Sequence, residues 1–86
     1  MAPGPSAVIR RGRMSPHWLR LAPGACASVR NDDPVSHDLV GASEPTTVAS
    51  SDVARVCFTG RGLHRLRIPG RGFSGGFVIV DPALAT

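Results

Sequence analysis

The chain consists of short apolar runs separated by turns rich in Pro and Gly. Ten Gly and eight Pro stand among its 86 residues, and no stretch shows the 3.6-residue periodicity of an amphipathic helix. Polar and apolar residues instead alternate in residues 25–31 and again in residues 53–59. Alternate residues of a strand point to opposite faces of a sheet. The pattern therefore predicts an all-β domain of six to eight short strands, packed as a sandwich.

The turns between these runs give the expected strand boundaries. Strands are expected over residues 7–11, 18–21, 25–31, 35–40, 53–59, 63–68 and 73–80, with at most one short strand near residues 47–49. Ser15-Pro16 indicates a turn or a sheet edge, because Pro cannot donate a ladder hydrogen bond. We expect one small domain over residues 7–81, a disordered arm over residues 1–6 and a tail over residues 82–86.

The charge of the chain bears on its partners. All ten basic residues are Arg, against six acidic residues, and the net charge of +4 favours encounter with acidic surfaces. Proteins that follow a nucleic-acid strand add exposed aromatic side chains for stacking. Here Trp18, Phe58, Phe73 and Phe77 are the only candidates, and three of these four positions are expected in the core. The sequence thus favours an acidic or other protein partner over nucleic acid.

Neither a membrane span nor a secretory signal is predicted. No apolar segment approaches the roughly 20 residues that a spanning helix needs. Residues 1–13 contain Pro, Gly and Arg but no apolar core of a signal peptide. The prediction from the residues alone is a soluble domain.

The order of these features resembles the cupredoxins, the small blue-copper proteins that include the plastocyanin-like domains. The resemblance extends from Val8 to Val80 and combines turn, core and polar positions. Its residues are Val8, Pro16, Leu19, Leu21, Pro23, Gly24, Val29, Asn31, Asp33 and His37, followed by Phe58, Thr59, Gly62, Gly75, Phe77 and Ile79. It implies an antiparallel Greek-key β-sandwich, a copper-dependent electron carrier, and a periplasmic or extracellular location.

The copper ligands that the resemblance implies are mostly missing. The first imidazole falls on His37, but the thiolate position falls on Ile68 and the axial thioether position on Phe73. The second imidazole falls in residues 69–72, which contain no His. Because a type-1 copper site needs a thiolate and two imidazoles, the prediction is a degenerate site without a cofactor. The alternative is copper or zinc held loosely by His37 together with His64 and Cys57.

The two cysteines have two open interpretations. Cys26 and Cys57 both face outward on strands that pair in the cupredoxin sheet, so the resemblance allows a disulfide if their Cα atoms lie within about 7 Å. A disulfide would imply an oxidising compartment. Two free thiols in a reducing compartment are the equal alternative.

Two further groups of residues are candidate sites, each with a structural alternative. His37 is expected to bond a backbone carbonyl if it binds no metal, and His64 to tie a loop to the sandwich as a tyrosine does in the family. Arg61, Arg65, Arg67 and Arg71 are candidates for an anion-binding patch. The alternative for this group is a solvated row of charges that protects a sheet edge.

No catalytic arrangement emerges from the sequence. The acidic residues lie in turns, and no serine or cysteine has a base and an orienting group nearby. We therefore predict a binding or interaction module and not an enzyme. The first alternative is a copper protein that transfers electrons or sequesters copper, and the second is a polyanion-binding module that uses the Arg patch.

Overall fold

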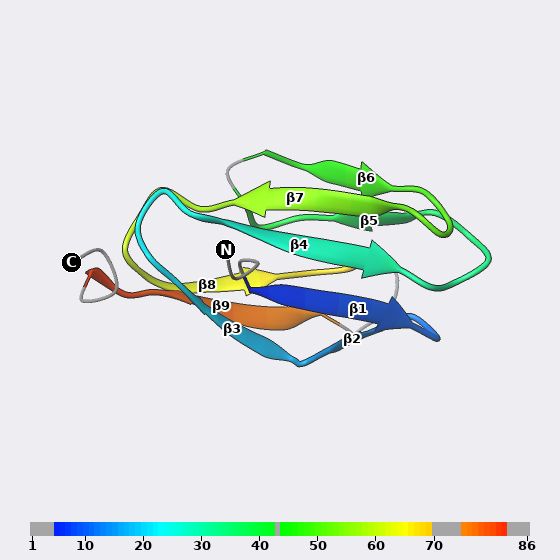
Figure 1. Ribbon diagram of the computed structural model, residues 1–86, viewed down its shortest axis with the longest axis horizontal. Helices are drawn as coiled ribbons and strands as arrows, with labels where there is room; N and C mark the ends of the chain where they lie inside the picture. The colour runs from blue at the N-terminus through cyan, green and yellow to red at the C-terminus, as the bar shows by residue number, and fades with distance from the viewer. Residues whose placement is uncertain (1–4, 43, 70–74, 83–86) are drawn as a thin grey trace.

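A computed structural model describes residues 5–42, 44–69 and 75–82 of the chain. In this part of the chain it forms nine strands (Figure 1): β1 (Ser6–Arg10), β2 (Arg13–Ser15), β3 (Trp18–Leu21), β4 (Cys26–Asn31), β5 (His37–Leu39), β6 (Thr46–Val48), β7 (Val53–Cys57), β8 (Gly62–Leu66) and β9 (Gly76–Val80). Over the same residues, no helix has both the length and the apolar character needed to span a bilayer.

The strands form a two-sheet sandwich, which confirms the predicted fold class. One sheet has the order β2-β1-β4-β7, the other has the order β3-β9-β8, and β5 and β6 form a separate hairpin (Figure 1). The pairing is mixed where the sequence predicted it to be antiparallel, since β1–β4 and β3–β9 are parallel. Parallel neighbours need a crossover between them. For β1 and β4 the chain makes this crossover by passing through β3 in the opposite sheet.

Most expected strands are present, with small changes at their ends. One observed strand was not expected. This strand is β2, an edge strand of the four-stranded sheet that ends just before Pro16. An edge position tolerates the missing donor of a proline. The last strand begins at Gly76. The expected start of that strand, most of the arm and most of the tail lie outside the described residues.

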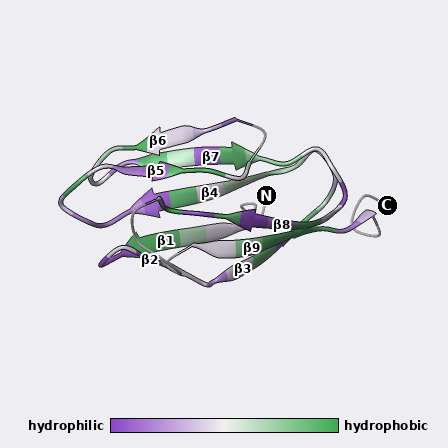
Figure 2. Cartoon of the chain, turned by 180° about the vertical axis from the view of Figure 1, so that it is seen from behind, coloured by the Kyte–Doolittle hydropathy of each residue, from purple (hydrophilic) through white to green (hydrophobic). Residues whose placement is uncertain are grey.

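Alternating residues of both sheets meet in one core. Phe58 is its largest side chain and is 1% exposed. Figure 2 shows the apolar character of β9 after its first residue, and the mixture of polar and apolar residues in β3 and β8. The core consists of Ala7, Ile9, Met14, Leu19, Leu21, Ala27, Val29, Leu39, Val48, Val56, Phe58, Leu66, Ile68, Val78 and Val80.

Candidate functional site

A buried carboxylate–imidazole pair lies where the chain passes from β4 to β5. His37 is the first residue of β5, and its Nε2 atom is 2.7 Å from Oδ2 of Asp33. Both side chains are buried. The sequence predicted a backbone carbonyl as the partner of a metal-free His37, and the partner is a carboxylate instead.

The same carboxylate holds the turn between β1 and β2. Asp33 accepts a hydrogen bond from the backbone amide of Arg11 and a second one, of 2.7 Å, from the amide of Gly12. Arg11 has φ = 56° and Gly12 has φ = 72°, the pair of positive φ values that a two-residue type I′ hairpin turn requires. Asp33 therefore connects the β1–β2 turn to the start of β5.

The backbone around Asp33 is fixed by a neighbouring amide side chain. Asn31, which is fully buried, accepts a 2.9 Å hydrogen bond from the amide of Asp33. Its Nδ2 atom donates to the carbonyls of Val35 and Val48 at 2.8 and 3.0 Å. Asn31 and Asp33 thus replace the backbone partners that this irregular segment lacks. The sequence predicted Asn31 at the end of a strand over residues 25–31, but it gave no sign that Asp33 is buried.

These contacts set the protonation of Asp33. The hydrogen bond from the amide of Gly12, followed by those from His37 and Arg11, lowers the pKa of the carboxyl below its ordinary value of 3.8, although burial opposes the shift. Each of these donors favours the ionised form. Asp33 is therefore a carboxylate that the fold uses as an acceptor near neutral pH.

The donor atoms present do not fit a type-1 copper centre. Ile68, at the thiolate position, is 2% exposed and belongs to the core. Both cysteines of the chain are joined in a disulfide, so neither is a thiolate. Among the described residues, no three His, Cys, Asp or Glu side chains lie close enough together to hold a metal ion. Phe73 and the loop expected to carry the second imidazole lie mostly outside those residues, and that loop contains no His.

His64, the other candidate ligand, has a structural partner. Its Nε2 atom is 2.5 Å from the carbonyl oxygen of Gly60. Its ring lies 5.3 Å from the ring of Phe58, centroid to centroid. The imidazole thus ties the turn before β8 to the core, the type of contact that the sequence predicted for it.

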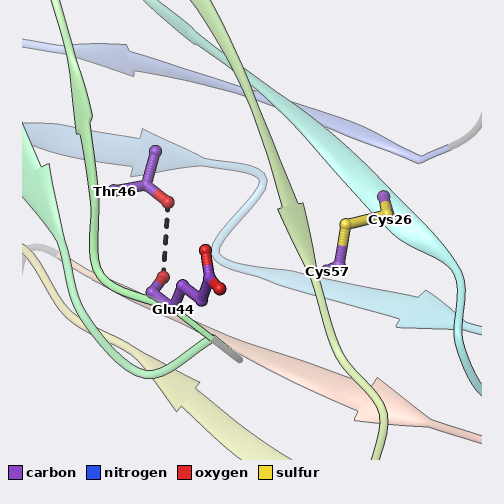
Figure 3. The surroundings of a disulfide bond; sticks show 4 residues. All are labelled: Cys26, Glu44, Thr46 and Cys57. Carbon is purple, nitrogen blue, oxygen red and sulfur yellow. Dashed lines mark hydrogen bonds between the residues drawn. A yellow bond between two sulfur atoms is a disulfide. The ribbon is translucent and has the colours of Figure 1, made fainter.

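The Cys26–Cys57 disulfide links β4 to β7 (Figure 3). The two residues are direct cross-strand partners, and their Cα atoms are 4.0 Å apart. Glu44 and Thr46 lie close to Cys57 (Figure 3), with Thr46 Oγ1 donating a 3.3 Å hydrogen bond to the carbonyl of Glu44. Of the two interpretations left open by the sequence, the structure has the disulfide.

Three of the four candidate anion-binding residues lie in or beside β8. Arg65 is exposed on the strand, Arg61 is exposed in the turn before it, and Arg67 is exposed just after it. No ion pair between described residues involves any of these three. Arg71 lies outside the described residues.

Two aromatic side chains lie beside this group on the outer face of the same sheet. Trp18 is 50% exposed and Phe77 is 43% exposed. The expectation that three of the four aromatic residues belong to the core is therefore wrong. The alternation of β3 and β9 explains the error, because Leu19, Leu21, Val78 and Val80 occupy the inward positions and leave the aromatic residues on the other face.

Solved structures that are similar to this chain include cupredoxins. A purple cupredoxin from Nitrosopumilus maritimus is 18% identical, with a TM-score of 0.75 over 90% of this chain and 99% of that chain. A reduced, Cu(I) form of an amicyanin variant is 15% identical, with a TM-score of 0.77 over 94% of this chain and 85% of that chain. At these identities the likeness shows a cupredoxin-like fold. No family profile matches the sequence, and no curated protein does so significantly.

Proposed function

We propose that this chain is a cupredoxin-fold binding module that works without a type-1 copper centre and without catalysing a reaction. The observation that carries the proposal is the absence of a thiolate and of a second imidazole from the family's ligand positions. Of these positions only His37 still holds a metal-binding residue, and its Nε2 atom is already bonded to Asp33, which also holds a backbone turn. One remaining imidazole nitrogen is too few donors for a type-1 centre.

The sulfur chemistry supports the same conclusion. A type-1 centre needs a cysteine thiolate, and both cysteines are consumed by the Cys26–Cys57 disulfide. Without a redox centre, a small sandwich acts through recognition by its surface. The disulfide also supports an extracytoplasmic location, because such bonds persist in oxidising compartments.

A copper titration tests the proposal. The oxidised protein, with its disulfide verified by thiol titration, is mixed with Cu(II) and followed by visible absorption and by metal analysis after gel filtration. We expect no intense charge-transfer band and no stoichiometric copper, whereas amicyanin treated in parallel gives both. One retained equivalent of copper that is lost in His37→Gln would overturn the proposal in favour of an electron-transfer or copper-sequestering protein.

Polyanion binding is a second candidate, favoured by the exposed Arg61, Arg65 and Arg67. Guanidinium groups bind phosphate or sulfate groups bidentately. This function predicts an affinity for heparin or polyphosphate that falls steeply with salt. Fluorescence titration at low and physiological ionic strength checks it, and an affinity that does not depend on salt would remove it.

A further inference from the structure

We infer that the outer face of the β3-β9-β8 sheet is a docking surface for a protein segment that carries apolar side chains flanked by carboxylates. This inference rests on the proposed function and names the kind of partner that the module binds. We call this surface the Trp18 face. Its members are Trp18, Arg20, Leu63, Arg65, Phe77 and Ile79.

The strand register arranges these six residues in two rows across the sheet. In one row Trp18 pairs with Phe77, and Phe77 pairs with Arg65. In the other row Arg20 pairs with Ile79, and Ile79 pairs with Leu63. Neighbouring strands lie roughly 4.8 Å apart and next-but-one residues roughly 6.6 Å apart, so the side chains form one continuous patch.

The apolar part of the Trp18 face is unusual for a solvated sheet surface. The outer face of a sandwich sheet is normally polar, but Leu63 is 66% exposed, and Trp18 and Phe77 are about half exposed. A hollow of about 90 Å³ opens beside Phe77 and Arg65. Exposed apolar patches with polar rims mark interaction sites, and tryptophan and arginine are enriched among the residues that dominate binding energy.

The charge of the Trp18 face indicates that the partner is acidic. Arg20 is paired with Asp81 through a 2.6 Å contact, whereas no ion pair between described residues involves Arg65. The uncompensated charge on the Trp18 face is therefore positive, as is the net charge of +4 of the chain. A carboxylate of the partner would bind the Arg65 guanidinium in a bidentate geometry.

The same features disfavour two other occupants. A second copy of the chain, placed face to face, would bring the uncompensated Arg65 of both copies onto one small patch, and like charges oppose such contacts. A nucleic-acid strand would find two rings for stacking, but Leu63 and Ile79 offer none.

The single tryptophan of the chain makes the test direct, because Trp18 is the only one and it lies within the proposed surface. The probes are synthetic peptides in which Leu, Phe or Trp alternates with Asp or Glu, and a matched set with Gln in place of the acidic residues. Binding is followed by the fluorescence of Trp18 with the non-aromatic peptides and by NMR shifts with all of them. We expect acidic peptides to bind with Kd below about 100 µM and the Gln set at least about tenfold more weakly.

Two variants of β8 and two matched controls locate the binding. Leu63→Ser and Arg65→Glu change exposed residues of the Trp18 face, and we expect each to weaken peptide binding by about tenfold or more. Val53→Ser and Arg55→Glu make comparable changes, from an aliphatic residue to Ser and from Arg to Glu, two residues apart on β7 in the other sheet. Val53 is 54% exposed, so these controls should fold equally well and leave binding within about twofold.

Four results would overturn the inference. The first is that no acidic peptide binds, and the second is that the β7 controls weaken binding as much as the β8 variants. The third is salt-dependent binding of a single-stranded oligonucleotide to the same face, in preference to the peptides. The fourth is a dimer, detected by sedimentation, that Leu63→Ser dissociates. The copper titration is independent of all four, so failure of this inference is distinguishable from failure of the proposed function.

Discussion

The Nε2 atom of His37 and the Oδ2 atom of Asp33 lie 2.7 Å apart in a buried pair at the start of β5. The carboxylate of this pair also accepts the amide hydrogens of Arg11 and Gly12. One side chain therefore connects the start of β5 to the β1–β2 turn, whose amides lie 21 and 22 positions before Asp33 in the chain. The ionised form of Asp33 is needed for these contacts, and this makes the stability of the fold sensitive to acid.

We predict that the free energy of unfolding falls as the pH drops below about 4. The pKa of Asp33 in the folded protein lies below its ordinary value of 3.8, chiefly because of the hydrogen bond from the Gly12 amide. The unfolded chain therefore takes up the proton more readily than the folded one. The stabilisation is fully present above the unfolded pKa, and it is lost as the pH falls through the folded pKa.

Urea unfolding at a series of pH values from neutral to acid measures this effect. Asp33→Asn should lower the midpoint at neutral pH and flatten the change between pH 5 and 3, because the titrating group is gone. Glu44→Gln removes an exposed carboxylate instead and should keep the acid dependence. An Asp33→Asn variant with the acid profile of the unchanged protein would show that Asp33 is not the responsible group.

We predict that Arg11→Asn stabilises the protein. Arg11 adopts a positive φ of 56°, a conformation that costs most L-residues about 1 kcal/mol and that Asn adopts more readily. The change also creates Asn-Gly, the preferred sequence of a type I′ turn. The expected gain is about 0.5–1 kcal/mol by urea unfolding. Arg11→Gln removes the same charge without a preference for positive φ, so an equal gain in that control would contradict the explanation.

The core and most strands could be predicted from the sequence because they depend on local patterns. Period-2 alternation placed Val56 and Phe58 on the inner face of the sandwich, and both are 1% exposed. The Pro/Gly turns gave most strand ends to within a residue or two, and Trp18–Leu21 is found as a strand with the predicted bounds.

The candidate sites depend on contacts between distant residues, which no local pattern specifies. Asp33 looked like a turn residue because its partners in the β1–β2 turn lie 21 and 22 positions earlier. Three of the four aromatic residues were expected in the core, but Trp18 and Phe77 are both exposed. Their position on the outer face follows from the alternation of β3 and β9, in which smaller aliphatic residues occupy the inner positions.

Separate substitutions of Phe58 and Phe77 test whether Phe58 belongs to the core and Phe77 to the outer face. Phe58→Ala should destabilise the protein by about 3–5 kcal/mol, because it leaves a cavity in a fully packed core. Phe77→Ala should cost about 1 kcal/mol or less, since the ring is 43% exposed. Thermal unfolding followed by circular dichroism compares the two. Equal losses of stability in the two variants would mean that Phe77 belongs to the core and is not part of the Trp18 face.

The disulfide should supply a large part of the stability of so small a domain. Cys26 and Cys57 are 31 positions apart, and closing a loop of that length in the unfolded chain is worth about 3–4 kcal/mol. We expect a Cys26→Ala/Cys57→Ala double variant to unfold at correspondingly lower urea concentration. A reductant should lower the stability of the unchanged protein to that of the double variant, without affecting the double variant itself.

Mass spectrometry of the unreduced protein supplies the control, because a disulfide makes the chain lighter by two hydrogens. Two alkylatable thiols in protein made under oxidising conditions would contradict the bond directly.

If the bond is present, its reduction should weaken peptide binding to the Trp18 face only through unfolding, because β4 and β7 belong to the other sheet. Binding lost in reduced protein that is still folded would instead indicate that the two sheets are coupled.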